Sequence, residues 1–97
     1  MKKFKQVSEI YLIAALLSYG YPQNDVDRTN PRRQVYTFED EEQSVFLLVD
    51  GKIEERKIDL DRFESLFLAN KVMLRPNYPS VLKSLKYSIY SYRDDKR

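Results

Sequence analysis

The chain has 97 residues and a formal net charge of +2, and 42% of its residues are hydrophobic. It contains neither cysteine nor histidine, which excludes disulfides, thiolate metal sites and catalysis by serine–histidine or cysteine–histidine pairs. Eight tyrosines and five phenylalanines supply enough apolar surface for a single folded domain that comprises residues 1–97.

The amino-terminal segment MKKFK precedes a short apolar run, residues 10–17. This run is far shorter than the ~20 residues needed to cross a bilayer, and no signal-peptide cleavage site follows it. We therefore expect a buried helix over residues 9–19, in a cytoplasmic protein that contacts no membrane. Ser8 is the predicted N-cap of this helix, and Gly20 can adopt the left-handed conformation that ends it.

The next segment, residues 21–33, contains two prolines, two asparagines and two aspartates, which predict a loop. Aromatic and β-branched residues are frequent in residues 33–39, which are therefore a predicted strand. The acidic run that follows, residues 39–42, is typical of a solvated turn, because it lacks the spaced ligands and the glycine of a calcium loop.

A β-hairpin is predicted next. The apolar run of residues 45–49 is typical of a central strand that is buried on both faces. The dipeptide Asp50-Gly51 is a strong signal for a two-residue turn, so the polar residues 52–57 are the expected edge strand. Pairing across this turn sets Leu48 opposite Ile53.

A second helix is predicted over residues 60–72. Asp59 can cap it, and Ile58 can pack against Phe63 as a hydrophobic staple. With a final helix, the elements predict an α+β domain: a three-stranded antiparallel β-meander packed with three helices in the order α-β-β-β-α-α.

The central strand also has an apolar second face, made by Val45, Leu47 and Val49. A small sheet with two apolar faces needs cover on both of them, and a second copy of the chain can supply part of that cover. The sequence therefore favours a homodimer.

The carboxyl-terminal residues 78–97 predict a third helix, with Pro79 in its first turn and residues 93–97 as a tail that can fray. Its apolar side recurs at helical spacing and should face the core: Val81, Leu82, Leu85, Ile89 and Tyr92. Its opposite side is basic and aromatic and is the predicted binding surface: Lys83, Lys86, Tyr87, Tyr90 and Arg93.

The charge of the chain is concentrated in the same region. Residues 71–97 hold seven basic and two acidic side chains, a net charge of +5, whereas residues 1–70 have a net charge of −3. Lysines can neutralise phosphates while tyrosine rings stack on unpaired bases, each stacked base contributing ~1–3 kcal/mol. Arg32 and Arg33, with the amino-terminal lysines, would extend this surface if they lie near the last helix. Tyrosines also occur at protein interfaces and against neighbouring helices, so both alternatives remain open.

Three segments, YLIAALLSYGY, RRQVYTFED and LKSLKYSIYSY, resemble the DUF5659-type short proteins of Firmicutes and their phages. Members of that family share a YLAAYLL-like helix, a basic-then-aromatic strand that ends in F-x-D, and an LRTLKSRIY-like closing helix. The resemblance covers about half of the chain, and residues 44–57 depart from it by carrying a hairpin signal in place of a helix. The family has no assigned activity, so the resemblance implies a phage or mobile-element accessory protein and no catalytic residue.

Glu55 and Lys57 imitate the E-x-K half of a magnesium-dependent nuclease, which would need Asp40 or Asp50 as a second carboxylate. Such a short charged pattern arises readily by chance, so we expect no enzyme, cofactor, metal ion or small-molecule substrate. The predicted function is that of a non-catalytic phage- or mobile-element-type accessory protein, which binds nucleic acid or a nucleoprotein machine. The alternative is an inhibitor or adaptor that acts on a host enzyme through protein–protein contacts.

Overall fold

The computed structural model describes residues 3–30 and 33–95, except the side chains of residues 90–95. Within these residues the chain forms five strands and three helices. Their bounds are β1 Phe4–Val7, α1 Ile10–Ser18, β2 Gln23–Asp27, β3 Val35–Glu39, β4 Gln43–Val49, β5 Lys52–Ile58, α2 Leu60–Leu68 and α3 Tyr78–Asp95. Strands β1, β3 and β2 form one antiparallel sheet in that spatial order, and β4 pairs with β5 in a separate antiparallel hairpin.

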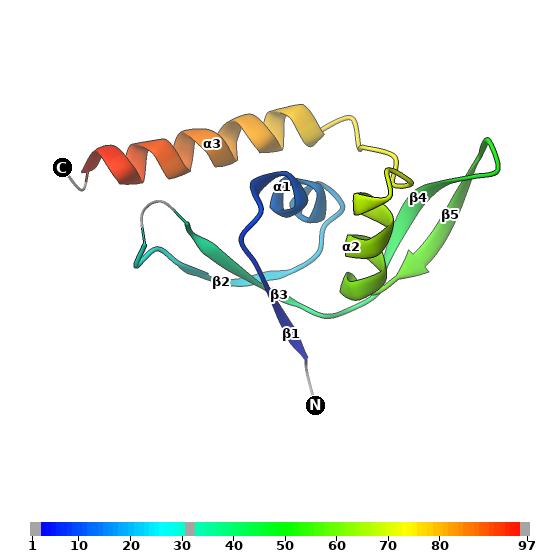
Figure 1. Ribbon diagram of the computed structural model, residues 1–97, viewed down its shortest axis with the longest axis horizontal. Helices are drawn as coiled ribbons and strands as arrows, with labels where there is room; N and C mark the ends of the chain where they lie inside the picture. Colours follow the sequence, from blue (N-terminus) through cyan, green and yellow to red (C-terminus); the bar gives the residue numbers. More distant parts are fainter. Residues whose placement is uncertain (1–2, 31–32, 96–97) are drawn as a thin grey trace.

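Helix α1 lies between α3 and the three-stranded sheet, and α2 lies between α1 and the β4–β5 hairpin (Figure 1). The tip of the hairpin extends away from the rest of the molecule. The prediction of an α+β domain with three helices is confirmed. The prediction of a single three-stranded meander is wrong, because the strands number five in the described residues and are divided between two sheets.

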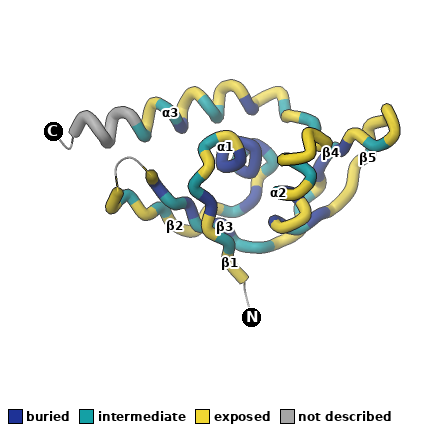
Figure 2. The backbone as a smooth tube through the Cα atoms, in the orientation of Figure 1, coloured by how far each residue is buried: buried dark blue, intermediate teal, exposed yellow. Residues whose placement is uncertain are grey.

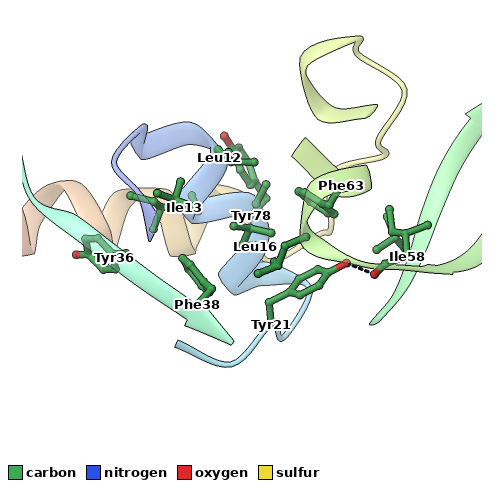
Figure 3. Packing of buried hydrophobic residues seen from close by; sticks show 14 of the residues in the cluster. Leu12, Ile13, Leu16, Tyr21, Tyr36, Phe38, Ile58, Phe63 and Tyr78 are labelled. Carbon is green, nitrogen blue, oxygen red and sulfur yellow. Dashed lines mark hydrogen bonds between the residues drawn. The ribbon is translucent and has the colours of Figure 1, made fainter. Parts of the chain in front are cut away.

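The core is built around α1, in which residues 12–16 are all buried. Five consecutive buried residues cover the whole circumference of a helix, so α1 requires partners on every side. The sheet contributes Tyr36 and Phe38, α2 contributes Phe63, and α3 contributes Tyr78 (Figure 3). In the part of the chain that the structure describes, no helix has both the length and the apolar character of a bilayer span.

The amino-terminal cap of α1 is Glu9, so the prediction of Ser8 is wrong. The Glu9 carboxylate accepts hydrogen bonds from the backbone amides of Tyr11 at 3.1 Å and of Leu12 at 2.8 Å. A carboxylate at this position satisfies two amides that have no partner within the helix. Its charge also suits the positive end of the helix dipole, an advantage that a serine hydroxyl lacks.

Helices α1 and α2 end in the same hydrogen-bonded turn. After α1, the Gly20 amide donates to the carbonyl of Leu17, and the Tyr21 amide donates to that of Leu16, both at 3.1 Å. This pair of bonds is the Schellman motif, which requires a left-handed residue just after the helix. Gly20 provides it with φ +87°, and Asn70 provides it after α2 with φ +60°.

A Gly20→Ala variant is expected to unfold with a free energy lower by about 1–2 kcal/mol, the usual cost of a left-handed conformation at a residue with a Cβ. No heavy atom lies within 4 Å of the position that the added Cβ would occupy, so the cost is conformational rather than steric. Urea denaturation followed by circular dichroism measures it. Asn70→Gly, the opposite change at the equivalent position of α2, should raise stability, and a Gly20→Ala variant as stable as the wild type would contradict the motif.

The β4–β5 hairpin confirms the predicted turn and register. Leu48 pairs with Ile53 across the turn, and Phe46 pairs with Glu55. Asp50 and its neighbour Gly51 both have positive φ, as a two-residue type I′ turn requires.

The prediction that residues 45–49 form a central strand buried on both faces is wrong. Val45 and Leu47 are buried, whereas Leu48 is exposed on the opposite face. On one side β4 pairs with β5, and on the other it hydrogen-bonds to residues 71–73. There the Leu48 amide donates to the Lys71 carbonyl at 2.7 Å, and the Met73 amide donates to the Phe46 carbonyl at 2.9 Å. The apolar run is therefore buried on one face only, against the core.

Val45 and Leu47 are buried within one chain and Val49 is partly buried, so these side chains give little reason for a second copy, and the homodimer stays a prediction. Val45 and Leu47 belong to the core cluster, so a second copy is not needed to cover them.

The loop predicted over residues 21–33 contains strand β2, which pairs with β3 through a register irregularity between Gln23 and Asp25. Val26 is the one apolar residue of β2, so neither alternation nor β-propensity identifies this strand from the sequence. Strand β1, at the opposite edge of the sheet, has four residues and is also absent from the predicted elements. Both strands exist because β3, which is rich in β-forming residues, provides an edge for each of them to pair with.

Helix α2 begins as predicted and ends earlier than predicted. The Asp59 side chain caps it by accepting from the backbone amide of Arg62 at 2.9 Å, and both members of the predicted staple, Ile58 and Phe63, are buried. The helix ends at Leu68 rather than at residue 72, because residues 71–73 turn back to pair with β4.

Candidate functional site

Helix α3 positions the predicted binding surface by docking its apolar side on α1. Leu85 is buried, and the partly buried members of the same side pack against the core: Val81, Leu82 and Ile89. The predicted inward side of the helix is therefore confirmed for residues 81–89, and Tyr92 lies outside the described side chains. The opposite side of α3 faces outward along the length of the molecule (Figure 2).

Lys83 and Tyr87 lie on the solvent side of α3, one helical turn apart. Tyr87 is 75% exposed, the largest exposed fraction among the large hydrophobic side chains in the described part of the chain. An exposed phenol ring in this position makes no contribution to the core and is free to contact a partner. Tyr90 and Arg93, predicted for the same surface, have side chains outside the described set.

Lys86 contacts an aromatic residue that sequence reasoning did not include. Its ammonium nitrogen lies 5.4 Å from the centroid of the Tyr11 ring on α1, within cation–π distance. Tyr11 is 47% exposed, so one face of the molecule carries lysines and tyrosines from two helices. The sequence does contain a signal for this contact: Tyr11 is an amphipathic residue at the start of an otherwise aliphatic helix, which is typical of a partly exposed position.

The surface formed by Tyr11, Lys83, Lys86 and Tyr87 is called the lysine–tyrosine surface below. Glu9 lies next to this surface, and its carboxylate is already bonded to backbone amides as the cap of α1. Burial raises the pKa of the Tyr78 phenol, and the nearby Glu9 and Tyr11 raise it further.

Of the amino-terminal basic residues predicted to extend the lysine–tyrosine surface, Lys5 does not do so. Lys5 points to α2, where its ammonium group lies 2.7 Å from Asp61 and 3.3 Å from Glu64. The hydrogen bond to Asp61 raises the pKa of Lys5 and keeps its charge paired. The guanidinium Nε of Arg33 donates to the Ser8 hydroxyl at 3.2 Å, and Arg32 lies outside the described residues.

Comparison of the chain with protein-family models, with curated proteins and with solved structures finds no match. The resemblance to DUF5659-type proteins therefore stays a prediction.

The residues considered for a nuclease have other roles. The Asp40 carboxylate accepts a hydrogen bond from the Leu60 amide at 3.2 Å, at the start of α2, and Asp50 forms the hairpin turn. Glu55 lies five positions from Asp50 along the hairpin, a separation of roughly 15 Å in an extended strand. Among the described residues, no three side chains of the histidine, cysteine or acidic types gather as a metal site.

Proposed function

We propose that the protein is a non-catalytic accessory protein of the phage or mobile-element type, and that its lysine–tyrosine surface binds single-stranded nucleic acid or a nucleoprotein machine. One observation carries the proposal: α3 exposes Lys83 and Tyr87 to solvent, and the partly buried Lys86 beside them contacts the half-exposed ring of Tyr11 on α1. Tyr90 and Arg93 would continue this surface along the helix, and Arg33 would contribute through its guanidinium nitrogens other than Nε, which donates to Ser8.

The chemistry of the surface favours unpaired bases over a duplex. Lysines bind phosphates without reading the sequence, whereas exposed aromatic rings need the free face of a base. The cation–π contact between Lys86 and Tyr11 holds a positive charge beside a ring that remains half exposed. A phosphate and its adjacent base can therefore be bound at neighbouring points.

The alternative function is that of an inhibitor or adaptor that binds a host protein. The 75% exposure of Tyr87 supports it as well, because tyrosine is enriched at protein interfaces. Ionic strength separates the two functions. Phosphate contacts make the affinity fall steeply with salt, whereas a tyrosine-centred protein interface changes little.

A Lys83→Glu, Lys86→Glu double variant is expected to lose most of its retention of a single-stranded oligonucleotide in gel-shift titrations. For the wild type, the affinity should fall between about 50 and about 200 mM salt, and removing two phosphate contacts should reduce the slope of log K against log salt by about 1.4. The matched control is Lys52→Glu, Lys71→Glu, which makes the same charge change at two exposed lysines of the hairpin region.

If the double variant and its control bind equally well, the lysine–tyrosine surface is not the nucleic-acid site. If the wild type does not retain the oligonucleotide at either salt concentration, the nucleic-acid function is wrong and the protein-directed alternative takes its place.

A further inference from the structure

A hollow of about 450 Å³ lies between the carboxyl end of α1 and the outer face of the β4–β5 hairpin. Its volume is in the range of small-molecule sites, ~300–1,000 Å³. The antiparallel register pairs Phe46 with Glu55 and Ser44 with Lys57, and these four side chains point to the same face of the hairpin. No part of α3 lines the hollow, so it is separate from the lysine–tyrosine surface.

Arg75 is held in place at this hollow by two aromatic rings. Its guanidinium carbon lies 5.8 Å from the centroid of Tyr19 and 5.4 Å from that of Phe46. The Tyr19 hydroxyl is fixed in turn, because it donates to the Met73 carbonyl and accepts from the Phe46 amide at 3.4 Å. A guanidinium group that contacts two rings, one of them anchored through its hydroxyl, loses less freedom when it binds a ligand.

The charges around the hollow are balanced rather than of one sign. Two cations, Arg75 and Lys57, line it together with two carboxylates, Glu42 and Glu55. In the described residues, no ion pair joins either cation to a carboxylate. Both signs of charge are therefore available to a ligand, and a polyanion would be repelled by the carboxylates.

We propose that this hollow binds a free α-amino acid. The Arg75 fork would take the ligand carboxylate in two parallel hydrogen bonds, with Lys57 adding a second positive charge. Glu42 and Glu55 would take the ligand ammonium group, and the hydroxyl of Ser44 would lie between the two ends. This role also accounts for the charged pair Glu55 and Lys57 without a metal ion.

Titrations monitored by the backbone and arginine side-chain NMR signals of the intact chain test the proposal. The probes are L-glutamine, which carries both charges, acetate, which carries the carboxylate alone, and methylammonium, which carries the ammonium alone. L-Glutamine is expected to cause saturable shifts at the Arg75 Nε–H and at the amides of β4 near Phe46, with a dissociation constant in the millimolar range. Acetate and methylammonium are each expected to bind at least ~10-fold more weakly, because each loses one charged pair.

Two variants locate the contacts. Arg75→Lys keeps the charge and most of the aliphatic side chain but loses the planar guanidinium group that can make two parallel hydrogen bonds. It should weaken L-glutamine binding roughly 10-fold. Glu55→Gln removes one partner of the ammonium group and should weaken L-glutamine without weakening acetate. The matched control is Glu54→Gln, which changes the neighbouring residue on the opposite face of β5 and should leave binding unchanged.

Saturable L-glutamine shifts that are lost in Arg75→Lys and retained in Glu54→Gln would support the proposal. Three results would overturn it: no saturable shift with L-glutamine, equal affinity for acetate and L-glutamine, or equal effects of Glu54→Gln and Glu55→Gln. Oligonucleotide binding is measured separately, so failure of this site leaves the proposed function untouched.

Discussion

A Phe63→Ala variant is expected to lose about 3–5 kcal/mol of unfolding free energy, the usual cost of removing a buried phenylalanine ring. Phe63 is 0% exposed and joins three aromatic rings, with centroid distances of 5.7 Å to Tyr19, 5.4 Å to Tyr21 and 6.1 Å to Phe67. The contacts to Tyr19 and Tyr21 are edge-to-face, a favoured geometry for aromatic pairs. Because whole domains are stable by only about 5–15 kcal/mol, this single change should remove a large part of the free energy of unfolding.

Urea denaturation monitored by circular dichroism measures the loss. Phe4→Ala is the matched control, because Phe4 is half exposed and its removal creates no internal cavity. If the two variants lost similar amounts of stability, the aromatic cluster around Phe63 would not have the central place in the core that its burial indicates.

The stability of the protein is expected to fall as the pH rises above about 10, the ordinary pKa of tyrosine. Burial raises the pKa of Tyr21 well above that value, and it also raises the pKa values of Tyr36 and Tyr78. The folded state therefore keeps these protons where the unfolded chain releases them. The stabilisation is complete below the unfolded pKa and is lost as the pH rises toward the folded values. For each tyrosine that is protonated in the folded state and ionised in the unfolded chain, the free energy of unfolding falls by about 1.4 kcal/mol per pH unit.

A Tyr21→Phe variant tests the contribution of one of these groups. At neutral pH it should be less stable by about 1–3 kcal/mol, because the Tyr21 hydroxyl donates to the buried Ile58 carbonyl at 2.7 Å (Figure 3). Above about pH 10 its stability should fall less steeply than that of the wild type, so the difference between the two narrows. Phe38→Leu, a control at a buried ring without a hydroxyl, should lose the same amount at every pH. Parallel curves for the wild type and Tyr21→Phe would show that Tyr21 does not carry the alkaline transition.

The parts of the fold that the sequence predicts are those set by neighbouring residues. The hairpin turn at Asp50-Gly51 and the cap of α2 at Asp59 each depend on the geometry of a few consecutive residues. The inward side of α3 follows from a single helical period, with Leu85 at its centre. These local structures are the same in the folded protein as in the prediction because no contact with a distant segment changes them.

The features that were missed depend on contacts between distant segments. Strand β2 has little β-propensity of its own and forms because β3 offers an edge, and β4 is buried on the face where Val45 and Leu47 pack on the core. The Asp40 carboxylate was predicted to be part of a solvated turn, yet it accepts from Leu60, twenty positions later.

The candidate site shows the same division between local and distant signals. Lys83 and Tyr87 could be placed on one side of α3 from their spacing alone. The contact of Lys86 with Tyr11 required α1 and α3 to be docked.

The docking of α1 against α3 brings together two helices that are far apart in the sequence, residues 10–18 and residues 78–95. During synthesis, α1 leaves the ribosome long before α3, so the side of α1 that α3 covers stays exposed until α3 has emerged. A chain that ends before residue 78 would lack α3 and would expose apolar side chains of α1.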